Sequence, residues 1–188
     1  MERRYLKKFP QFSRLWLVLL ILLLGFSVGC QKKEPPLSPA ATRFKREVKE
    51  CIHKVTKPLI GPLAKGDSPG IHAALKKSEP ENLKLCISCP FRMGVMDMYG
   101  NSLALYPPRK NTTLDFYRYE VVQQALRDHK IGQQRLYLQD GSRLYVICVP
   151  ILKNDKVLGL LAIALSAADA KNKWGLTEKE FMAIDFNR

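Results

Sequence analysis

The residues best suited to chemistry in this chain are its cysteines. There are five, and two of them, Cys86 and Cys89, are separated by only two residues. This spacing is compatible with a disulfide, with thiol redox exchange and with zinc binding. Redox exchange needs such a pair at the start of a helix, whereas Pro90 and strand-forming residues follow Cys89. Covalent haem attachment needs a histidine directly after the second cysteine, where Pro90 stands.

Four cysteines remain as disulfide candidates once Cys30 is set aside for the reason given below: Cys51, Cys86, Cys89 and Cys148. They allow three complete pairings, and the sequence leaves all three open. A zinc site could instead combine the close pair with Cys51, His53 or His72. No second closely spaced pair supports zinc, so we rank a structural disulfide first, a metal site second and catalytic redox chemistry last.

The sequence gives no sign of an enzyme. It contains no nucleophile elbow and no histidine-rich metal motif. Its three histidines, His53, His72 and His129, are scattered along the chain and are expected at the surface. We therefore predict no catalytic residue, no cofactor and no metal.

Arginine and tyrosine side chains gather in one part of the chain, as a ligand site would require. Arginine forks bind carboxylates, and tyrosines offer an apolar wall with a polar tip. The candidates are Tyr106, Arg109, Tyr117, Arg118 and Tyr119, with Tyr137 and Tyr145 on later strands. The alternative is that the tyrosines belong to the core and the arginines are solvated. We interpret Asp97 as a turn-stabilising residue beside Gly100.

The elements that must position these residues begin with a helix over 42–57. Phe44, Val48, Ile52 and Val55 recur on one helical face there. Thr42 is the expected cap, and Pro58 is the expected end. Residues 60–84 are predicted to be a loop-rich connector with a short helix near 71–77.

Strand patterns follow the Cys86–Cys89 pair. We predict strands over 92–98, 102–106, 134–138, 143–149 and 156–165, with hairpin turns at Gly100-Asn101 and Asp140-Gly141. A helix over 114–130 separates the second strand from the third. A last short helix begins at the capping box of Thr177 and Glu180. This order predicts an α+β fold, a five-stranded antiparallel sheet with helices on its faces.

The N-terminus has the layout of an export signal. A basic stretch, which includes Arg3, Arg4 and Lys7, precedes the uncharged residues 15–29. This apolar run is short for a membrane span. Ser27-Val28-Gly29-Cys30 resembles the lipobox of bacterial lipoproteins, although that family usually has Leu where Ser27 stands. The resemblance implies cleavage before Cys30 and lipid attachment to it; the alternative is an uncleaved anchor with an incidental cysteine.

The resemblance divides the chain into a signal peptide over 1–29, a lipidated tether over 30–41 and one domain over 42–188. Gln31, which is not Asp, favours the outer membrane, facing the periplasm, in a cell that has one. Residues 31–85 hold 12 basic and six acidic residues, so much of the net charge of +14 lies near the tether. Such charge could bind anionic lipid or another polyanion, while export argues against a nucleic-acid partner.

The domain resembles a Cache domain, the extracytoplasmic relative of the PAS fold. Residues 95–101 resemble the first hairpin of that family, and residues 145–150 and 157–161 resemble its closing pair of strands. The resemblance implies a PAS-like sheet with a long N-terminal helix and a pocket for an amino acid, carboxylate or amine. Most of the family are receptors with a transmembrane helix and a cytoplasmic output module, neither of which we find after Cys30.

Two classes of function are therefore expected. The first is a lipid-anchored sensory domain that binds a small anionic or zwitterionic ligand and passes its signal to a separate partner. The second is an envelope lipoprotein that binds another envelope protein and no small molecule. A redox or metal-binding role for Cys86 and Cys89 is the weaker third alternative.

Overall fold

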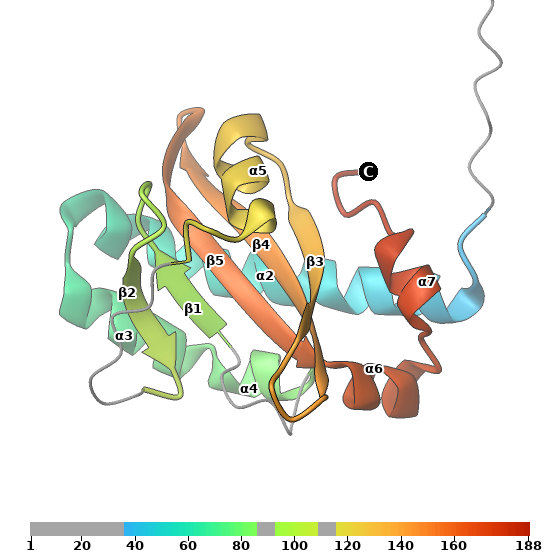
Figure 1. Cartoon of the computed structure of the whole chain (residues 1–188). Helices are drawn as coiled ribbons and strands as arrows, with labels where there is room; N and C mark the ends of the chain where they lie inside the picture. Colours follow the sequence, from blue (N-terminus) through green and yellow to red (C-terminus); the bar gives the residue numbers. More distant parts are fainter. Residues whose placement is uncertain (1–35, 86–92, 109–115) are drawn as a thin grey trace, which may run out of the picture. The chain divides into compact units, whose positions relative to one another are not determined.

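The computed structural model describes residues 36–85, 93–108 and 116–188 (Figure 1). Its first described helix, α2, is Pro39–Lys65. Ser38 caps α2, because its side chain accepts a hydrogen bond from the Ala41 N–H at 3.1 Å. Pro39 follows at the start of the helix, where a missing N–H removes no hydrogen bond. The prediction that Thr42 is the cap was wrong, and the helix begins ahead of it.

The end of α2 also differs from the prediction. Pro58 and Pro62 both lie inside the helix, which ends only at Gly66 in the left-handed conformation. Each proline removes one hydrogen bond between backbone groups four residues apart. Val55 and Leu59 are nonetheless fully buried. Packing of this face against the sheet therefore outweighs the local preference against helix.

The segment 60–84 is mostly helical, so its interpretation as a loop-rich connector was wrong. After α2 come α3, Ser68–Lys77, and α4, Glu79–Leu83. The short helix predicted near 71–77 is confirmed by α3. Asp67 caps α3, since its side chain accepts a hydrogen bond from the Gly70 N–H at 3.0 Å.

Five strands form one antiparallel sheet in the order β2-β1-β5-β4-β3. They are β1 Met93–Met96, β2 Ser102–Tyr106, β3 Gly132–Tyr137, β4 Arg143–Lys153 and β5 Lys156–Ser166. All five predicted strands are confirmed, although β4 continues beyond its predicted end. The central strand β5 pairs with β4, its neighbour in sequence, and with β1, which lies far from it in sequence.

Three further helices complete the domain. α5 is Glu120–Asp128, shorter than the predicted helix over 114–130, because residues 116–119 form turns; residues 114 and 115 lie outside the described residues. α6, Ala167–Trp174, was not predicted. α7, Glu178–Met182, begins at the predicted capping box, in which the Glu180 N–H donates to the Thr177 side chain at 3.3 Å.

The two faces of the sheet contribute to two separate apolar cores. Figure 1 shows α5 on one face and α2 crossing the other. The larger core joins α2, α3, α6 and α7 to side chains such as Ile147 of β4 and Ile163 of β5. The smaller core lies under α5 and contains Val121 and Val122 of that helix with Val146 of β4. Neighbouring residues of one strand therefore enter different cores.

Residues Leu37–Arg188 form one compact unit. The expected α+β fold, a five-stranded antiparallel sheet with a long N-terminal helix and helical cover, is confirmed. In the part of the chain that the structure describes, no helix is long and apolar enough to cross a membrane.

Candidate functional site

The candidate site is built on the α5 side of the sheet, where adjoining strands carry small residues. Gly94 of β1 pairs with Ala162 of β5. Ala164 follows on the same face of β5 and pairs with Val146, a member of the smaller core. Ala162 and Ala164 are buried beneath the elements that cover this face. These small residues reduce the side-chain bulk on this part of β1 and β5, although the Leu105 side chain lies 3.0 Å from where a Gly94 Cβ would stand.

The segment 116–119, directly before α5, packs on the turn between β1 and β2. The Phe116 N–H donates a hydrogen bond to the Gly100 carbonyl at 3.1 Å. The Asp97 carboxylate orders this turn by accepting from the N–H groups of Tyr99 at 2.8 Å and Asn101 at 2.9 Å. The interpretation of Asp97 as a turn residue is thus confirmed. The hairpin turn and the segment before α5 therefore form one connected structure.

Gly100 leaves no room for a side chain between these two parts. Its φ is +81°, and a Cβ built there would lie 2.8 Å from the backbone of Tyr117. Gly141, in the β3–β4 turn, has a φ of +78° and nothing within 4 Å of the same position. The two glycines therefore share a backbone conformation and differ in what a side chain would meet.

We predict that Gly100→Ala lowers the free energy of unfolding by about 2–4 kcal/mol, because it adds a steric clash to the strain of positive φ. Gly141→Ala, the matched control, should cost about 1–2 kcal/mol from backbone strain alone. Urea denaturation measures both, and hydrogen exchange at residues 116–119 should accelerate only in the Gly100 variant. Equal costs with unchanged exchange would show that the segment does not rest on this turn.

Three of the predicted ligand residues lie on this segment. Tyr117 is 50% exposed, Tyr119 is 39% exposed, and Arg118 between them is also exposed. Phe116 lies partly buried against the smaller core and places its ring 6.0 Å from that of Tyr119. Arg109 lies outside the described residues. The segment thus carries an arginine and two tyrosines at the edge of the α5-covered face.

Tyr106 and Tyr145 lie on the other face of the sheet. The Tyr106 hydroxyl donates a hydrogen bond to the Glu79 carboxylate of α4 at 2.6 Å. Tyr145 is only 2% exposed and stacks on Phe181 with ring centroids 4.2 Å apart. Burial raises the pKa of Tyr145. The structure therefore does not bring these two tyrosines together with Tyr117 and Arg118.

Tyr137 is also separate from that segment. It lies on β3, is 64% exposed and has the Arg135 guanidinium 4.7 Å from its ring centroid. Arg135 and Arg143 both pair with the Glu178 carboxylate of α7, the latter at 3.1 Å. This ion-pair cluster joins the β3–β4 hairpin to α7.

The described cysteines are buried free thiols in different cores. Cys51 belongs to the larger core and Cys148 to the smaller one, on opposite faces of the sheet, so the two do not pair with each other. Cys86 and Cys89 lie outside the described residues. Cys51 is close to α4, because neighbouring Lys54 bonds Glu81 of that helix at 3.0 Å. A bond from Cys51 to Cys86 or Cys89, or one between those two, remains a prediction.

The structure places the three histidines, His53, His72 and His129, at the surface as predicted. Among the residues that the structure describes, no three His, Cys, Asp or Glu side chains are grouped to hold a metal ion.

Two open grooves lie on the α2 side of the sheet. One, of about 350 Å³, is lined by α2, the end of β4 and residues His129, Ile131 and Asn187. The other, of about 490 Å³, runs between the β3–β4 hairpin and helices α6 and α7, and Tyr145 and Arg143 line it. Arg143 already pairs with Glu178 there.

The small residues of the α5-covered face were missed by the sequence reasoning. Gly94, Ala162 and Ala164 were assigned to strands, but their common face follows only from the pairing of β1 with β5. The available signal was the alternation of large and small residues along 161–165.

The chain matches no family model and resembles no curated protein in sequence. Solved structures nevertheless share its fold. A domain of a sensory box/GGDEF family protein from Vibrio parahaemolyticus superposes with a TM-score of 0.54 and 14% identity, over 75% of this chain and 61% of that one. The sensory domain of the Campylobacter jejuni chemoreceptor Tlp3 with isoleucine bound gives a TM-score of 0.53 and 13% identity, over 90% and 69% of the two chains.

These likenesses confirm the predicted PAS/Cache-like fold. This chain spans about three fifths of the length of the Vibrio domain.

Proposed function

We propose that this chain is an extracytoplasmic lipoprotein whose Cache-like domain binds a small molecule and passes the signal to a separate envelope partner. The observation that carries the proposal is the fold, which this chain shares over 90% of its length with a sensory domain described with isoleucine bound. The signal-like residues 1–29 and Cys30 support the location and the lipid anchor.

The proposed ligand lies over Gly94 and Ala162, under the segment that leads into α5. Small residues form the proposed floor of the site, and Arg118, with Arg109 as a second candidate, supplies positive charge at the edge. An arginine fork binds a carboxylate through two charge-assisted hydrogen bonds. The ligand class is therefore anionic or zwitterionic, and its size is that of an amino acid or a short carboxylic acid.

A thermal-shift screen of residues 37–188 against amino acids, dicarboxylates and amines tests this proposal. We expect at least one amino acid or carboxylate to raise the melting temperature. Ala162→Leu should abolish that rise by filling the pocket, while Ala104→Leu, the same change in a buried residue of β2 on the other face, should keep it. Arg118→Ala should weaken the rise, whereas Arg127→Ala on the exposed side of α5 should not.

Two outcomes would contradict the proposed site. If Ala162→Leu retains the full ligand-induced rise, the pocket is not over β5. If Arg118→Ala and Arg109→Ala both retain it, arginine does not bind the ligand. A screen without any stabilising compound would favour the alternative of a protein-binding lipoprotein.

A further inference from the structure

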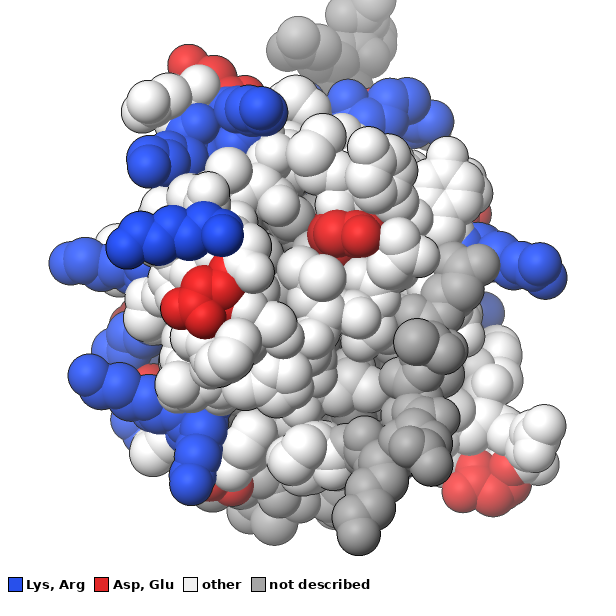
Figure 2. Space-filling model, turned by 90° about the vertical axis from the view of Figure 1, so that its left-hand side faces the viewer, with Lys and Arg blue, Asp and Glu red and all other residues white. Residues whose placement is uncertain are grey.

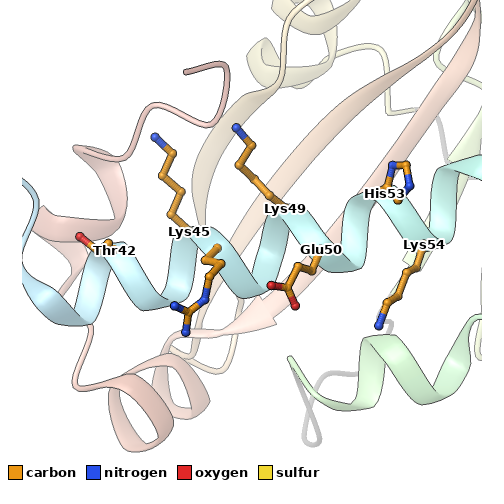
Figure 3. Close-up of a pocket in the computed structure, with 7 residues that line it drawn as sticks. Thr42, Lys45, Lys49, Glu50, His53 and Lys54 are labelled. Carbon is orange, nitrogen blue, oxygen red and sulfur yellow. The ribbon is translucent and has the colours of Figure 1, made fainter.

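The exposed side of α2 carries a row of basic residues. Arg46, Lys49, His53 and Lys57 are spaced by three or four residues, which places them on one helical face, and all four are exposed. This row is called the basic face below. Figure 3 shows part of it as a shallow hollow lined by residues of α2 alone, with Lys45, Lys49 and His53 extending to one side of the helix.

Most of the charge of the described residues belongs to this helix. They contain 21 lysines and arginines and 14 aspartates and glutamates, a formal charge of +7. α2 holds seven of these bases and only Glu47 and Glu50 of these acids, a formal charge of +5. Figure 2 shows the same unevenness, since lysines and arginines gather along one edge of that view while much of the face is uncharged.

The basic face keeps an excess of positive charge, although Glu50, four residues after Arg46, is exposed on the same side of α2 and lines the same hollow. Glu47 pairs with Arg43 at 2.9 Å, and its other oxygen accepts from the Trp174 indole at 3.1 Å. Lys54, at the flank, is paired with Glu81 of α4. Within the described part of the chain, Arg46 and Lys57 make no ion pair, and both point away from the buried side of the helix.

We propose that the basic face of α2 lies against an anionic lipid bilayer. The proposal rests on the proposed lipid anchor for its location. From Cys30 to Pro39, where α2 begins, nine residues can span about 30 Å at most. An anchored domain is therefore held close to the bilayer, at a high effective concentration.

Close contact is necessary because salt screens charges beyond about 8 Å at physiological ionic strength. A few lysines and arginines then suffice, since each contributes about a fivefold gain in binding near an anionic leaflet. This orientation also suits the proposed ligand site. α2 and α5 cover opposite faces of the sheet, so a domain lying on α2 presents its α5 side to the solvent.

Vesicle flotation with residues 37–188, which lack the anchor, tests the proposal. We expect binding to vesicles that contain phosphatidylglycerol, weak binding to phosphatidylcholine alone, and loss of binding as salt rises. Arg46→Gln with Lys57→Gln should weaken binding at least tenfold. Arg127→Gln with Lys130→Gln, which removes the same charge at and after α5, should leave it unchanged. Circular dichroism of each variant confirms that it is folded.

Three outcomes would overturn the proposal: equal binding to neutral vesicles, equal losses in the two double variants, or preference for a soluble polyanion over vesicles at matched charge. The anchor is tested separately by labelling cells with a fatty-acid probe. Cys30→Ala should abolish labelling of the full chain and leave a slower-migrating precursor. Labelling that persists would contradict the anchor, whereas vesicle binding of the unlipidated domain would stand or fall independently.

Discussion

Replacing Phe44 by alanine is expected to lower the free energy of unfolding by about 3–5 kcal/mol. Phe44 lies on the inner side of α2 with no exposed surface. Its ring makes edge contacts with those of Trp174, Phe181 and Phe186, at centroid distances of 5.1, 6.2 and 6.3 Å. One substitution thus removes the common partner of three rings from the C-terminal part of the domain.

Urea denaturation of residues 37–188 measures this loss, and Tyr99→Ala is its control. Tyr99 is 74% exposed, so its removal should change stability by about 0.5 kcal/mol or less. Because the free energy of unfolding of a domain is about 5–15 kcal/mol, the Phe44 variant should be left with only a small part of its stability. A loss below about 1.5 kcal/mol would mean that the aromatic cluster repacks around the cavity or is not formed.

The second large effect concerns thiol reactivity. Burial raises the pKa of Cys148 to about 12, and its side chain has no exposed surface. The thiolate is the reactive form, and an ordinary thiol has a pKa near 8.5. At pH 8 the native Cys148 should therefore react with iodoacetamide about a thousandfold more slowly than in urea, before any steric protection is counted.

Mass spectrometry of the labelled peptides measures both rates in protein exported to an oxidising compartment. Burial raises the pKa of Cys51 to about 12 as well, and nearby Glu81 adds to the rise. If Cys51 pairs with Cys86 or Cys89, it should resist labelling in urea until reductant is added, whereas Cys148 should label without reductant. Rapid labelling of native Cys148 would contradict its place in the smaller core. Four free thiols in unreduced, unfolded protein would contradict the disulfide prediction.

The strands could be predicted well because their signals are local. Alternating apolar residues and the turn residues Gly100 and Gly141 identify the hairpins without tertiary information. The helix α6 could not be predicted in the same way. Only Ala170 and Trp174 of its residues are buried, so it shows no apolar stripe. Its formation depends on Trp174 packing against Phe44, a contact between distant parts of the chain.

The length of α2 could not be predicted either, because it depends on packing between distant parts of the chain. Pro58 predicts a helix end from local chemistry, and burial of Leu59 in the larger core overrides it. No local signal reports that burial.

The candidate site was predicted only in part for a geometric reason. Tyr117 and Arg118 lie together on the segment before α5, whereas Tyr106 and Tyr145, which were grouped with them, lie on the other face of the sheet. Successive side chains of a strand point to opposite faces, so the face of Tyr145 depends on its register with β5. The register depends on which strands pair, and no local pattern in the sequence reports that pairing. The floor of Gly94 and Ala162 was missed for the same reason.

The strand order has a consequence for when the domain can fold during synthesis. β1 obtains a neighbour other than β2 only when β5 is available, and the inner side of α2 is covered only when Phe181 and Phe186 arrive. Contacts so distant in sequence form late, because a long loop must close first. A chain emerging N-terminus first therefore cannot complete its domain until residue 186 has been synthesised. This delay would keep the polypeptide unfolded during synthesis, and the proposed export through a narrow translocation channel would require such an unfolded chain.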